Sequence, residues 1–274
     1  MGVLVGADPE VFVKDKRGRF RSAHGLIEGT KKEPFKVKNG AVQVDGMALE
    51  FNIDAASTRD EFVHNIGSVL QQLAAMVPDY ELAIVPTATF HGNHMRVQPE
   101  VALELGCEPD FDAYKAKENP RPNNRTTMRT AAGHVHIGFT EGADPQDPEH
   151  IQRCITLIKH LDVFIGLPSM LWDNDAKRRM MYGKAGAFRP KSYGVEYRTP
   201  SNAWLKHPDL VGYVFDQVQA CVEFLKSGER VDPANQASVL DMINGKSNYY
   251  YHTPKQRLER VFPFIKLPPE VVVA

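Results

Sequence analysis

The chain carries the stretch Ala132-Gly133-His134-Val135-His136-Ile137-Gly138-Phe139, in which two histidines alternate with β-branched residues. Alternate side chains of a strand lie on one face of a sheet, so the stretch predicts a strand with both imidazoles on the same face. Val135 and Ile137 would pack behind them. Paired imidazoles on a rigid strand suit a metal ion or a charged ligand. They can equally be histidines that only satisfy neighbouring backbone groups, and the residues converging on that face decide between these interpretations.

The composition is that of an ordinary globular protein. The 274 residues are 42% hydrophobic and 24% charged, which is enough to bury a sizeable core. A formal net charge of −1 leaves no basic excess for binding nucleic-acid phosphates. The cysteines Cys107, Cys154 and Cys221 form neither a zinc motif nor a disulfide framework, so we expect a reducing compartment. With no signal peptide and no membrane-spanning stretch, we expect a cytoplasmic protein that binds neither membranes nor nucleic acids.

Periodicity and turn residues predict a mixed α+β chain. Strands are expected over residues 3–13, 41–52 (a strand pair or one bulged strand), 81–85 and 193–198, with a hairpin turn at 38–40. Helices are expected over residues 57–76 and 147–163 and from about 209, 235 and 254, with a basic helix or loop over 173–181. Residues 106–129 are expected to be irregular. We therefore expect one α+β domain over residues 1–274, with antiparallel strands backed by helices.

Two acidic motifs supply candidate ligands for a hard cation. Asp8-Pro9-Glu10 places two carboxylates on one face at the mouth of a strand, where they repel each other unless a cation joins them. Glu50 and Asn52 share one side of a predicted strand. Plainer interpretations are a surface turn for the first motif and a salt-bridged sheet residue for Glu50.

Residues 173–198 form a basic segment that can wrap phosphate oxygens, because arginine guanidinium groups match phosphate geometry. Its cations are Lys177, Arg178, Arg179, Lys184, Arg189, Lys191 and Arg198. A solvated loop is the alternative. Glu196 and Arg198 share a strand face, where they either neutralise each other or divide between a metal and a phosphate. Acids, imidazoles and arginines together are the groups that ATP·Mg²⁺ chemistry requires, although the chain has neither a Walker A motif nor the kinase motifs.

In their order along the chain these motifs resemble those of the glutamine-synthetase fold. Asp8-Pro9-Glu10 resembles its acid-x-acid motif, and Glu50 with Asn52 its second acidic strand. His134-Val135-His136 is similar to its His-x-His strand, and Glu196-Tyr197-Arg198 to its late Glu-x-Arg strand.

Residues 106–111 and 182–189 make the set look most like the phage-type carboxylate–amine ligases (COOH–NH2 ligase type 2). The resemblance covers about residues 3–205, and residues 206–274 supply C-terminal helices. It implies a glutamine-synthetase-like core with a curved, mainly antiparallel sheet. It also implies an amidoligase that uses ATP and Mg²⁺ or Mn²⁺ to join a small carboxylic acid to an amine, which would be an amino acid or peptide-like molecule. A phage-encoded enzyme would act in the host cytoplasm, and the oligomeric state is left open.

The resemblance also implies roles for individual residues. The metal ligands are Asp8, Glu10, Glu50, His134 and Glu196, and the groups facing the nucleotide are His136, Arg178, Arg179, Arg189 and Arg198. Of these, Arg179, Arg189, Arg198 and Glu196 are expected to stabilise the transferred phosphoryl group or its metal. Asp45 stays unassigned, because it lies closer to Glu50 than the corresponding acids of the larger enzymes.

Two other functions fit part of the pattern. A metal-dependent hydrolase would use His134, His136 and the acids to activate water, but it leaves the arginines without a task. A catalytically inactive ligand-binding protein of the same fold would keep the architecture without turnover. His91 and His94 are expected on the surface or the rim of the site, and Asn123-Asn124-Arg125 is a candidate for substrate contact because it precedes the histidine strand.

Overall fold

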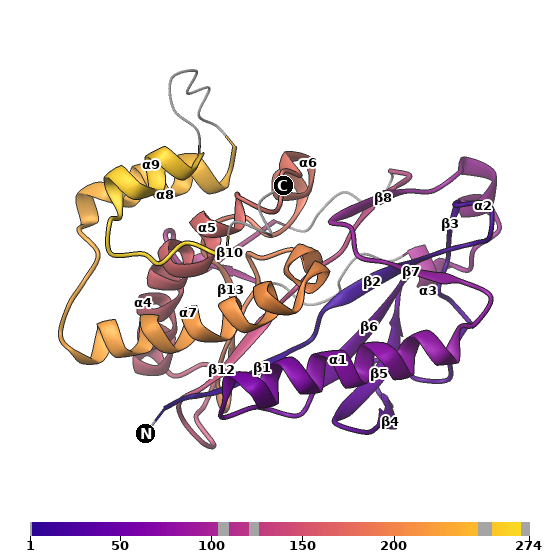
Figure 1. The fold of residues 1–274 in the computed structure, drawn as a ribbon, viewed down its shortest axis with the longest axis horizontal. Helices are drawn as coiled ribbons and strands as arrows, with labels where there is room; N and C mark the ends of the chain where they lie inside the picture. Colours follow the sequence, from indigo (N-terminus) through magenta and orange to yellow (C-terminus); the bar gives the residue numbers. More distant parts are fainter. Residues whose placement is uncertain (1, 104–109, 121–125, 246–253, 270–274) are drawn as a thin grey trace.

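The computed structural model describes residues 2–103, 110–120, 126–245 and 254–269 (Figure 1). Residues 106–109, which include Cys107, and residues 123–125 lie outside the described residues, so the predictions made for them stay predictions.

The first sheet carries the histidine strand. Its strand order is β1 (Leu4–Ala7), β12 (Val135–Gly138), β14 (Gly194–Tyr197), β13 (Ala187–Lys191), β9 (Phe111–Asp112) and β10 (Lys117–Glu118), and neighbouring strands are antiparallel. The strand β12 is therefore central, with a neighbour on each side, as a buried β-branched strand requires.

The second sheet carries the acidic motif around Glu50. Its order is β3 (Phe20–Arg21), β2 (Glu10–Lys14), β6 (Ala48–Ile53), β5 (Gly40–Asp45) and β4 (Phe35–Val37), and β7 (Glu81–Ala83) also pairs with β2. A further antiparallel pair joins β8 (Thr87–Thr89) to β11 (Met128–Thr130). The β4–β5 hairpin places Asn39 at a φ of 69°, a conformation that asparagine tolerates in tight turns.

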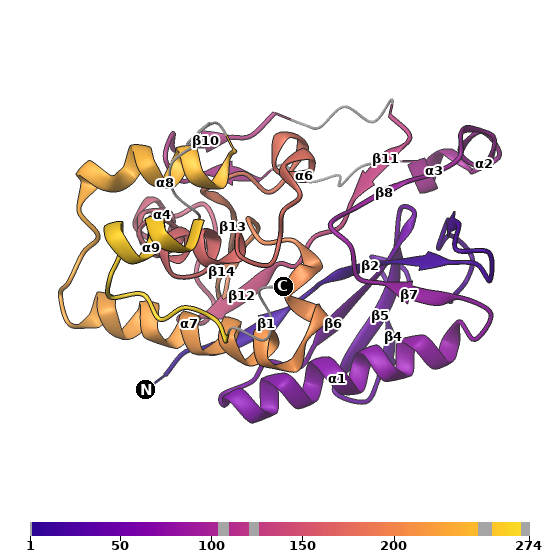
Figure 2. The same cartoon turned by 45° about the horizontal axis from the view of Figure 1, so that its top comes forward.

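The helices are α1 (Arg59–Met76), α2 (Gly92–Arg96), α3 (Glu100–Leu103), α4 (Pro148–Leu161), a π-helical turn (Asp162–Gly166), α5 (Leu167–Ser169), α6 (Ala176–Met181), α7 (Pro208–Lys226), α8 (Gln236–Ile243) and α9 (Pro254–Val261), with 3-10 turns at Asn202–Lys206 and Pro233–Asn235. The three longest, α1, α4 and α7, pack against the sheets or against one another. Helix α1 packs on β5 and β6, α4 on β13 and β14, and α7 contacts both helices. Figures 1 and 2 show α1 and α7 running along the same edge.

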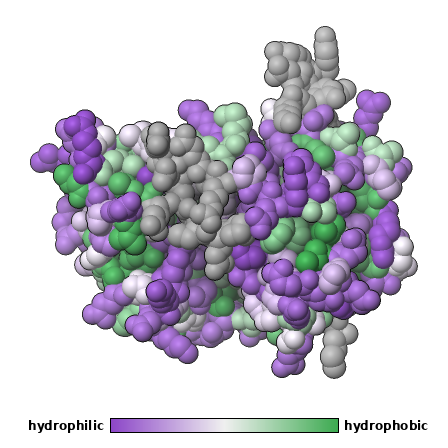
Figure 3. Space-filling view, turned by 180° about the vertical axis from the view of Figure 1, so that it is seen from behind, coloured by the Kyte–Doolittle hydropathy of each residue, from purple (hydrophilic) through white to green (hydrophobic). Residues whose placement is uncertain are grey.

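The hydrophobic core joins the helices to both sheets. Phe62 of α1 stacks on Trp204 with ring centroids 6.1 Å apart and also contacts Phe215 of α7 at 5.7 Å. All three rings are buried, so burial of apolar area fixes α1 and α7 against the sheets. The surface in Figure 3 is mainly hydrophilic, with small apolar areas between the polar side chains. Within the described residues, every helix is too short or too polar to cross a lipid bilayer.

The predicted α+β class, with curled antiparallel sheets and helices behind them, is confirmed. Residues 41–52 form the strand pair β5 and β6, and the helices predicted from residues 57, 147, 209, 235 and 254 are present. The prediction of one strand over residues 3–13 is wrong, because the chain leaves β1 at Ala7 and enters β2 of the other sheet at Glu10. Pro9 has no N–H to donate to a strand ladder, which favours this break. The strands β8, β9, β10, β11 and β13 were not predicted.

Candidate active site

The break at Pro9 sends two neighbouring acids to two different places. The Asp8 N–H lies 3.4 Å from the His134 carbonyl, and the Glu10 N–H donates to the Ala132 carbonyl at 2.9 Å. The segment thus runs beside the start of the histidine strand while it crosses between sheets. Asp8 faces the histidines, whereas Glu10 is paired with Glu50 across β2 and β6. The predicted sharing of one strand face by Asp8 and Glu10 is therefore wrong.

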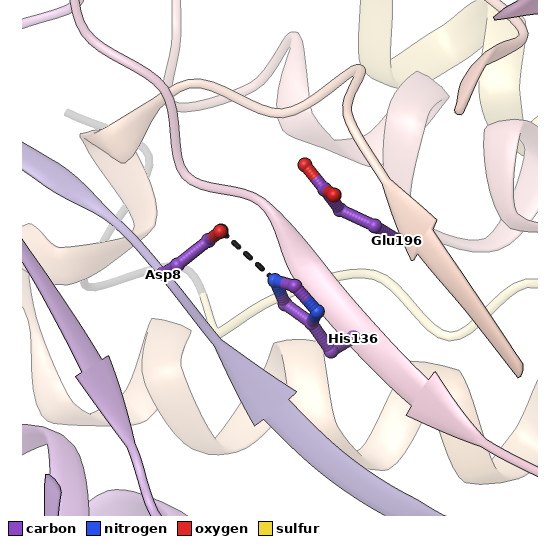
Figure 4. Close-up of side chains that lie close together, drawn as sticks. All are labelled: Asp8, His136 and Glu196. Carbon is purple, nitrogen blue, oxygen red and sulfur yellow. Dashed lines mark ion pairs between the residues drawn. The ribbon is translucent and has the colours of Figure 1, made fainter. Parts of the chain in front are cut away.

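The first group of side chains comes from three neighbouring strands and the residues next to them and is called the histidine centre; it consists of Asp8, His134, His136 and Glu196. Cross-strand register places His136 directly opposite Glu196. Figure 4 shows the Asp8 carboxylate directed at the His136 ring, with Nε2 3.0 Å from Asp8 Oδ1. The His134 Nδ1 atom lies 3.2 Å from the same oxygen and 3.3 Å from Glu196 Oε1. Both imidazoles therefore do face one way, toward Asp8.

Gly133 allows the histidine strand to approach the 3-10 turn behind it. A Cβ at this position would lie 2.2 Å from the Ser201 carbonyl oxygen and 2.4 Å from Trp204 Nε1. The Gly133 N–H donates to the Pro200 carbonyl at 3.1 Å, and Trp204 Nε1 donates to the Gly133 carbonyl at 3.1 Å. These contacts fix the backbone from which the His134 side chain projects.

Each imidazole contacts one tyrosine on its other nitrogen. The Tyr182 hydroxyl lies 3.1 Å from His134 Nε2, and the Tyr193 hydroxyl hydrogen-bonds to His136 Nδ1. Such partners on the second nitrogen orient a ring and fix the face that it presents to a ligand.

The two histidines differ in charge preference. Burial and the nearby Arg198 lower the pKa of His134 to about 4. Although burial opposes it, contact with Asp8 raises the pKa of His136. His134 is therefore neutral at pH 7, as a metal ligand must be, while the contact with Asp8 stabilises the protonated form of His136 relative to the neutral form.

Glu196 is surrounded by cations. It pairs with Arg198 Nη1, with Arg189 Nη1 at 3.1 Å and with Lys191 Nζ at 3.1 Å. Although burial would raise it, Arg198 and the histidines lower the pKa of Glu196 to about 2. Arg198 also lies 3.4 Å from Asp110 and donates to the Tyr182 hydroxyl. The carboxylate of Glu196 is thus ionised and charge-balanced.

Asp8 is the member of this centre that best fits a bound cation. Although burial would raise it, the imidazoles of His136 and His134 hold the pKa of Asp8 well below its usual value. Asp8 Oδ1 and His136 Nε2 are both buried without an aligned hydrogen bond among the described residues. A divalent cation would satisfy these atoms, and carboxylate oxygen with imidazole nitrogen suits Mn²⁺ or a similar transition-metal ion better than Mg²⁺.

The second group is called the carboxylate centre and consists of Glu10, Asp45 and Glu50. One oxygen from each lies within 4.8 Å of one from each of the others. Glu50 lies between Glu10 and Gln43 in the β2–β6–β5 register, and its Oε2 accepts from Gln43 Nε2 at 2.9 Å.

Repulsion dominates the carboxylate centre. Burial and the charge of Asp45 raise the pKa of Glu10 to about 7. Burial, with Asp8 and the other two acids of the centre, raises the pKa of Glu50 well above its usual value. Lys31 Nζ lies 2.8 Å from Asp45 Oδ2. Three carboxylates with so little compensating charge form the all-oxygen donor set that hard divalent cations prefer, so the residues fit a cation here as well.

Both centres border one cavity of about 370 Å³. Its wall includes Asp8, Glu10, Asp45, Glu50, His134, Lys31, Tyr182, Arg189, Lys191 and Arg198. Acids and cations from the two sheets therefore face the same space. Four of the five predicted metal ligands line it directly, and the fifth, Glu196, contacts His134 and Arg198.

Arg178 and Arg179 lie elsewhere. The fully buried Arg178 donates to the backbone carbonyls of Ala131, Thr199 and Pro200 at 3.0, 2.7 and 2.8 Å. Arg179 contacts the Asp173 carboxylate at 3.3 Å and is also buried. Neither residue lines the cavity. Their observed partners do not favour the phosphate-binding role predicted for them, and Arg178 instead ties α6 to the segments around the histidine strand.

His91 and His94 also lie outside the cavity wall. The His91 Nδ1 accepts from the Asn93 N–H at 3.3 Å at the start of α2. The His94 Nε2 accepts from the Ser22 N–H at 2.9 Å, and its ring stacks on Phe90. Both contacts are structural.

Some cavity residues were not singled out from the sequence. Asp45 was left unassigned, although Asp45-Gly46 is a hairpin signal that places this acid one strand from Glu50. Lys31 lies in a loop and Tyr182 directly after the short helix α6, where no periodic pattern marks a functional side chain. Lys191 was noted within the basic segment without a specific role.

The family of phage phiEco32-like COOH·NH2 ligases of type 2 matches residues 130–266, which is half of the 274-residue chain. The chain belongs to this family. The matched region contains both histidines, Glu196 and Arg198, and the resemblance stated from the motifs is confirmed. A COOH·NH2 ligase is an enzyme that forms a C–N bond, and membership of the family supports this activity class for the chain. No curated protein matches it.

Proposed function

We propose that this COOH·NH2 ligase is ATP-dependent and forms its amide bond through an acyl phosphate. The observation that carries the proposal is the shared cavity, in which two acid-rich centres face Arg189, Lys191 and Arg198. Three cationic side chains beside two candidate metal sites match the charge of a nucleotide triphosphate, which a ligase without a nucleotide substrate would not need to bind.

The proposed reaction has two steps. A carboxylate oxygen of the acid attacks the γ-phosphorus of ATP, and the bond between that phosphorus and ADP breaks. The amine nitrogen then attacks the acyl carbon, the bond from that carbon to the phosphate oxygen breaks, and the nitrogen loses a proton. The products are the amide, ADP and phosphate.

The donor sets support two cation sites. Asp8 and Glu196, with His134 or His136 as the nitrogen ligand, would hold one ion, and Glu10, Asp45 and Glu50 would hold the other. When bound, Mg²⁺ or Mn²⁺ would supply charge neutralisation for the triphosphate. Neutral His134 suits ligation, which supports the role that the resemblance implied for it, and the nucleotide-facing role implied for His136 stays a prediction.

The arginines and the lysine on the wall would bind the phosphates. Arg189 and Arg198 hold fixed positions through Glu196, and such preorganised donors stabilise developing charge without reorganising during the reaction. A cavity lined largely by charged groups suits a small acid and a small polar amine, such as an amino acid or a peptide-like molecule. We propose no nucleic-acid or membrane partner.

The test incubates the protein with ATP and Mg²⁺ against a panel of small carboxylic acids, with hydroxylamine replacing the amine. We expect ADP and phosphate in equal amounts, together with a hydroxamate of the correct acid detected by mass spectrometry. A hydroxamate that forms without ATP would contradict the acyl-phosphate route. Metal-dependent hydrolysis of amides without nucleotide would support a hydrolase instead, and metal binding without ATP turnover for any acid would support an inactive binding protein.

A further inference from the structure

The carboxylate centre already contains a cation of the protein itself. The side chain of Lys31 reaches the cavity wall and places Nζ 2.8 Å from Asp45 Oδ2. Because Glu10, Asp45 and Glu50 offer oxygens within 4.8 Å of one another, an ammonium bound to Asp45 lies next to the place where a divalent ion would be ligated.

The loop that carries Lys31 is attached closely to β5. The Val44 N–H donates to the Gly29 carbonyl at 2.9 Å, and a Cβ at Gly29 would lie 2.0 Å from the Val42 carbonyl oxygen. Glycine therefore allows a backbone approach that any other residue would block. This contact places Lys31 beside Asp45 at the end of the same strand.

The ion pair between Lys31 and Asp45 is short but partly exposed to solvent. The Lys31 side chain is 45% exposed and that of Asp45 is 19% exposed. A half-exposed ion pair gains little free energy, because solvent screens it and the lysine side chain loses rotamer freedom. Lys31 can therefore leave Asp45 at low cost.

We propose that Lys31 is the resident counter-ion of the carboxylate centre and that its ammonium group competes with a divalent cation for Asp45. The inference rests on the proposed metal-dependent function. In the metal-free protein Lys31 offsets part of the charge of three crowded carboxylates. A divalent ion on the same carboxylates repels the ammonium at short range, so metal binding displaces Lys31 toward the cavity, where it can pair with an anionic substrate group.

Lys31→Gln is the direct test, and Lys32→Gln is its matched control. Lys32 is the next residue, is exposed, carries the same charge and does not line the cavity. Mn²⁺ binding is measured by calorimetry on the full chain without nucleotide. We expect Lys31→Gln to tighten Mn²⁺ binding by at least about fivefold, because a close like charge is removed, while Lys32→Gln changes it less than about twofold.

A double-variant comparison localises the effect. In an Asp45→Asn background, which removes the acid that Lys31 contacts, Lys31→Gln should no longer tighten Mn²⁺ binding. If the gain persists there, or if Lys32→Gln gives the same gain, the effect is one of general charge and the inference is overturned.

Chemical labelling tests the displacement itself. Acetylation of Lys31, followed by peptide mass spectrometry, should become several-fold faster when Mn²⁺ is added, while Lys32 labelling stays constant. Slower labelling with metal would overturn the inference, as would weaker Mn²⁺ binding by Lys31→Gln. Equal Mn²⁺ affinity in all variants overturns this inference alone, whereas absence of Mn²⁺ binding in the unaltered protein overturns the metal-dependent function as well.

Discussion

The histidine centre and the carboxylate centre border the same cavity but have opposite charge balance. At the histidine centre the acids are held ionised, with the pKa of Glu196 lowered to about 2 and that of Asp8 well below its usual value. At the carboxylate centre the pKa of Glu10 rises to about 7 and that of Glu50 is well above its usual value. The first centre is therefore neutralised by protein cations, whereas in the second, where Lys31 contacts Asp45, the raised pKa values favour protonated carboxylates.

The difference shows that acids of similar motifs can affect the stability of the ligand-free protein in opposite ways. Removing an acid from the histidine centre leaves buried cations unpaired. Removing an acid from the carboxylate centre relieves repulsion. Both changes should impair a metal-dependent reaction, but they should move the stability of the metal-free protein in opposite directions.

The largest effect is expected for Glu196→Gln. ATP turnover should fall by about a thousandfold or more, because one anionic ligand and the partner of Arg198 are lost together. The free energy of unfolding should fall by about 3–5 kcal/mol, as when one partner of a buried ion pair is removed. Chemical denaturation and an ADP-release assay measure the two quantities. Unchanged turnover would contradict the role of Glu196.

Glu50→Gln should also abolish turnover while raising stability. In the presence of a chelator at pH 8, loss of one repelling carboxylate should stabilise the folded state by about 1 kcal/mol. Thermal unfolding with and without Mn²⁺ provides the comparison, with Glu196→Gln as the opposing variant. A lower melting temperature than that of the unaltered protein in chelator would remove the proposed distinction between the centres.

The pH dependence of stability sharpens the same distinction. The folded-state pKa of Glu10 is raised to about 7 and that of Glu50 is raised well above its usual value, so these two acids bind more protons in the folded than in the unfolded chain above about pH 4. The contribution of these acids to the stability of the metal-free protein should therefore fall as pH rises from about 4 through about 7, while His134, with its pKa lowered to about 4, contributes with the opposite sign. Asp162, buried behind β14 with its pKa raised to about 7, contributes with the same sign as Glu10 and Glu50.

Unfolding is followed across this pH range with chelator and with Mn²⁺. Metal should flatten the decline, because it replaces the bound protons of the carboxylate centre. Glu50→Gln should reduce the decline but not remove it, since Asp162 and Glu10 still titrate. A stability that rises across the same window in chelator would show that the acids of this centre are not the dominant groups.

The smallest effect is expected for Tyr193→Phe. It removes the hydroxyl that hydrogen-bonds to His136 Nδ1 but leaves the ring and both centres in place. A net loss of about 1 kcal/mol corresponds to a change of about fivefold in the KM for ATP. Steady-state kinetics measure it, and a loss as large as that of Glu196→Gln would mean that Tyr193 has a direct chemical role.

Local patterns in the sequence predicted the residue types of the site well. The alternation in residues 132–139 placed both imidazoles on one face, and Asp8 is in contact with both of them. The helices were equally predictable from the sequence, because capping residues and apolar periodicity are local signals. Thr58, for example, caps α1 by accepting a hydrogen bond from the Glu61 N–H.

Contacts between residues far apart in the sequence could not be predicted from such local patterns. Arg178 and Arg189 are both arginines of the basic segment. Arg178 nevertheless hydrogen-bonds to three backbone carbonyls, whereas Arg189 lines the cavity. Strand register decided that Asp45 joins Glu10 and Glu50, and register depends on the turn between β5 and β6. Pro9 was a visible signal for a strand break, and weighing it would have separated Asp8 from Glu10.

The crossing at Pro9 also sets a length scale. Asp8 and Glu10 belong to different centres but are separated by one residue, so their Cα atoms lie at most about 7 Å apart. The covalent chain through Pro9 therefore limits how far the two carboxylates can separate. A ligand that touches both centres therefore meets a nearly constant span, and this span selects molecules by size before any side chain distinguishes their chemistry.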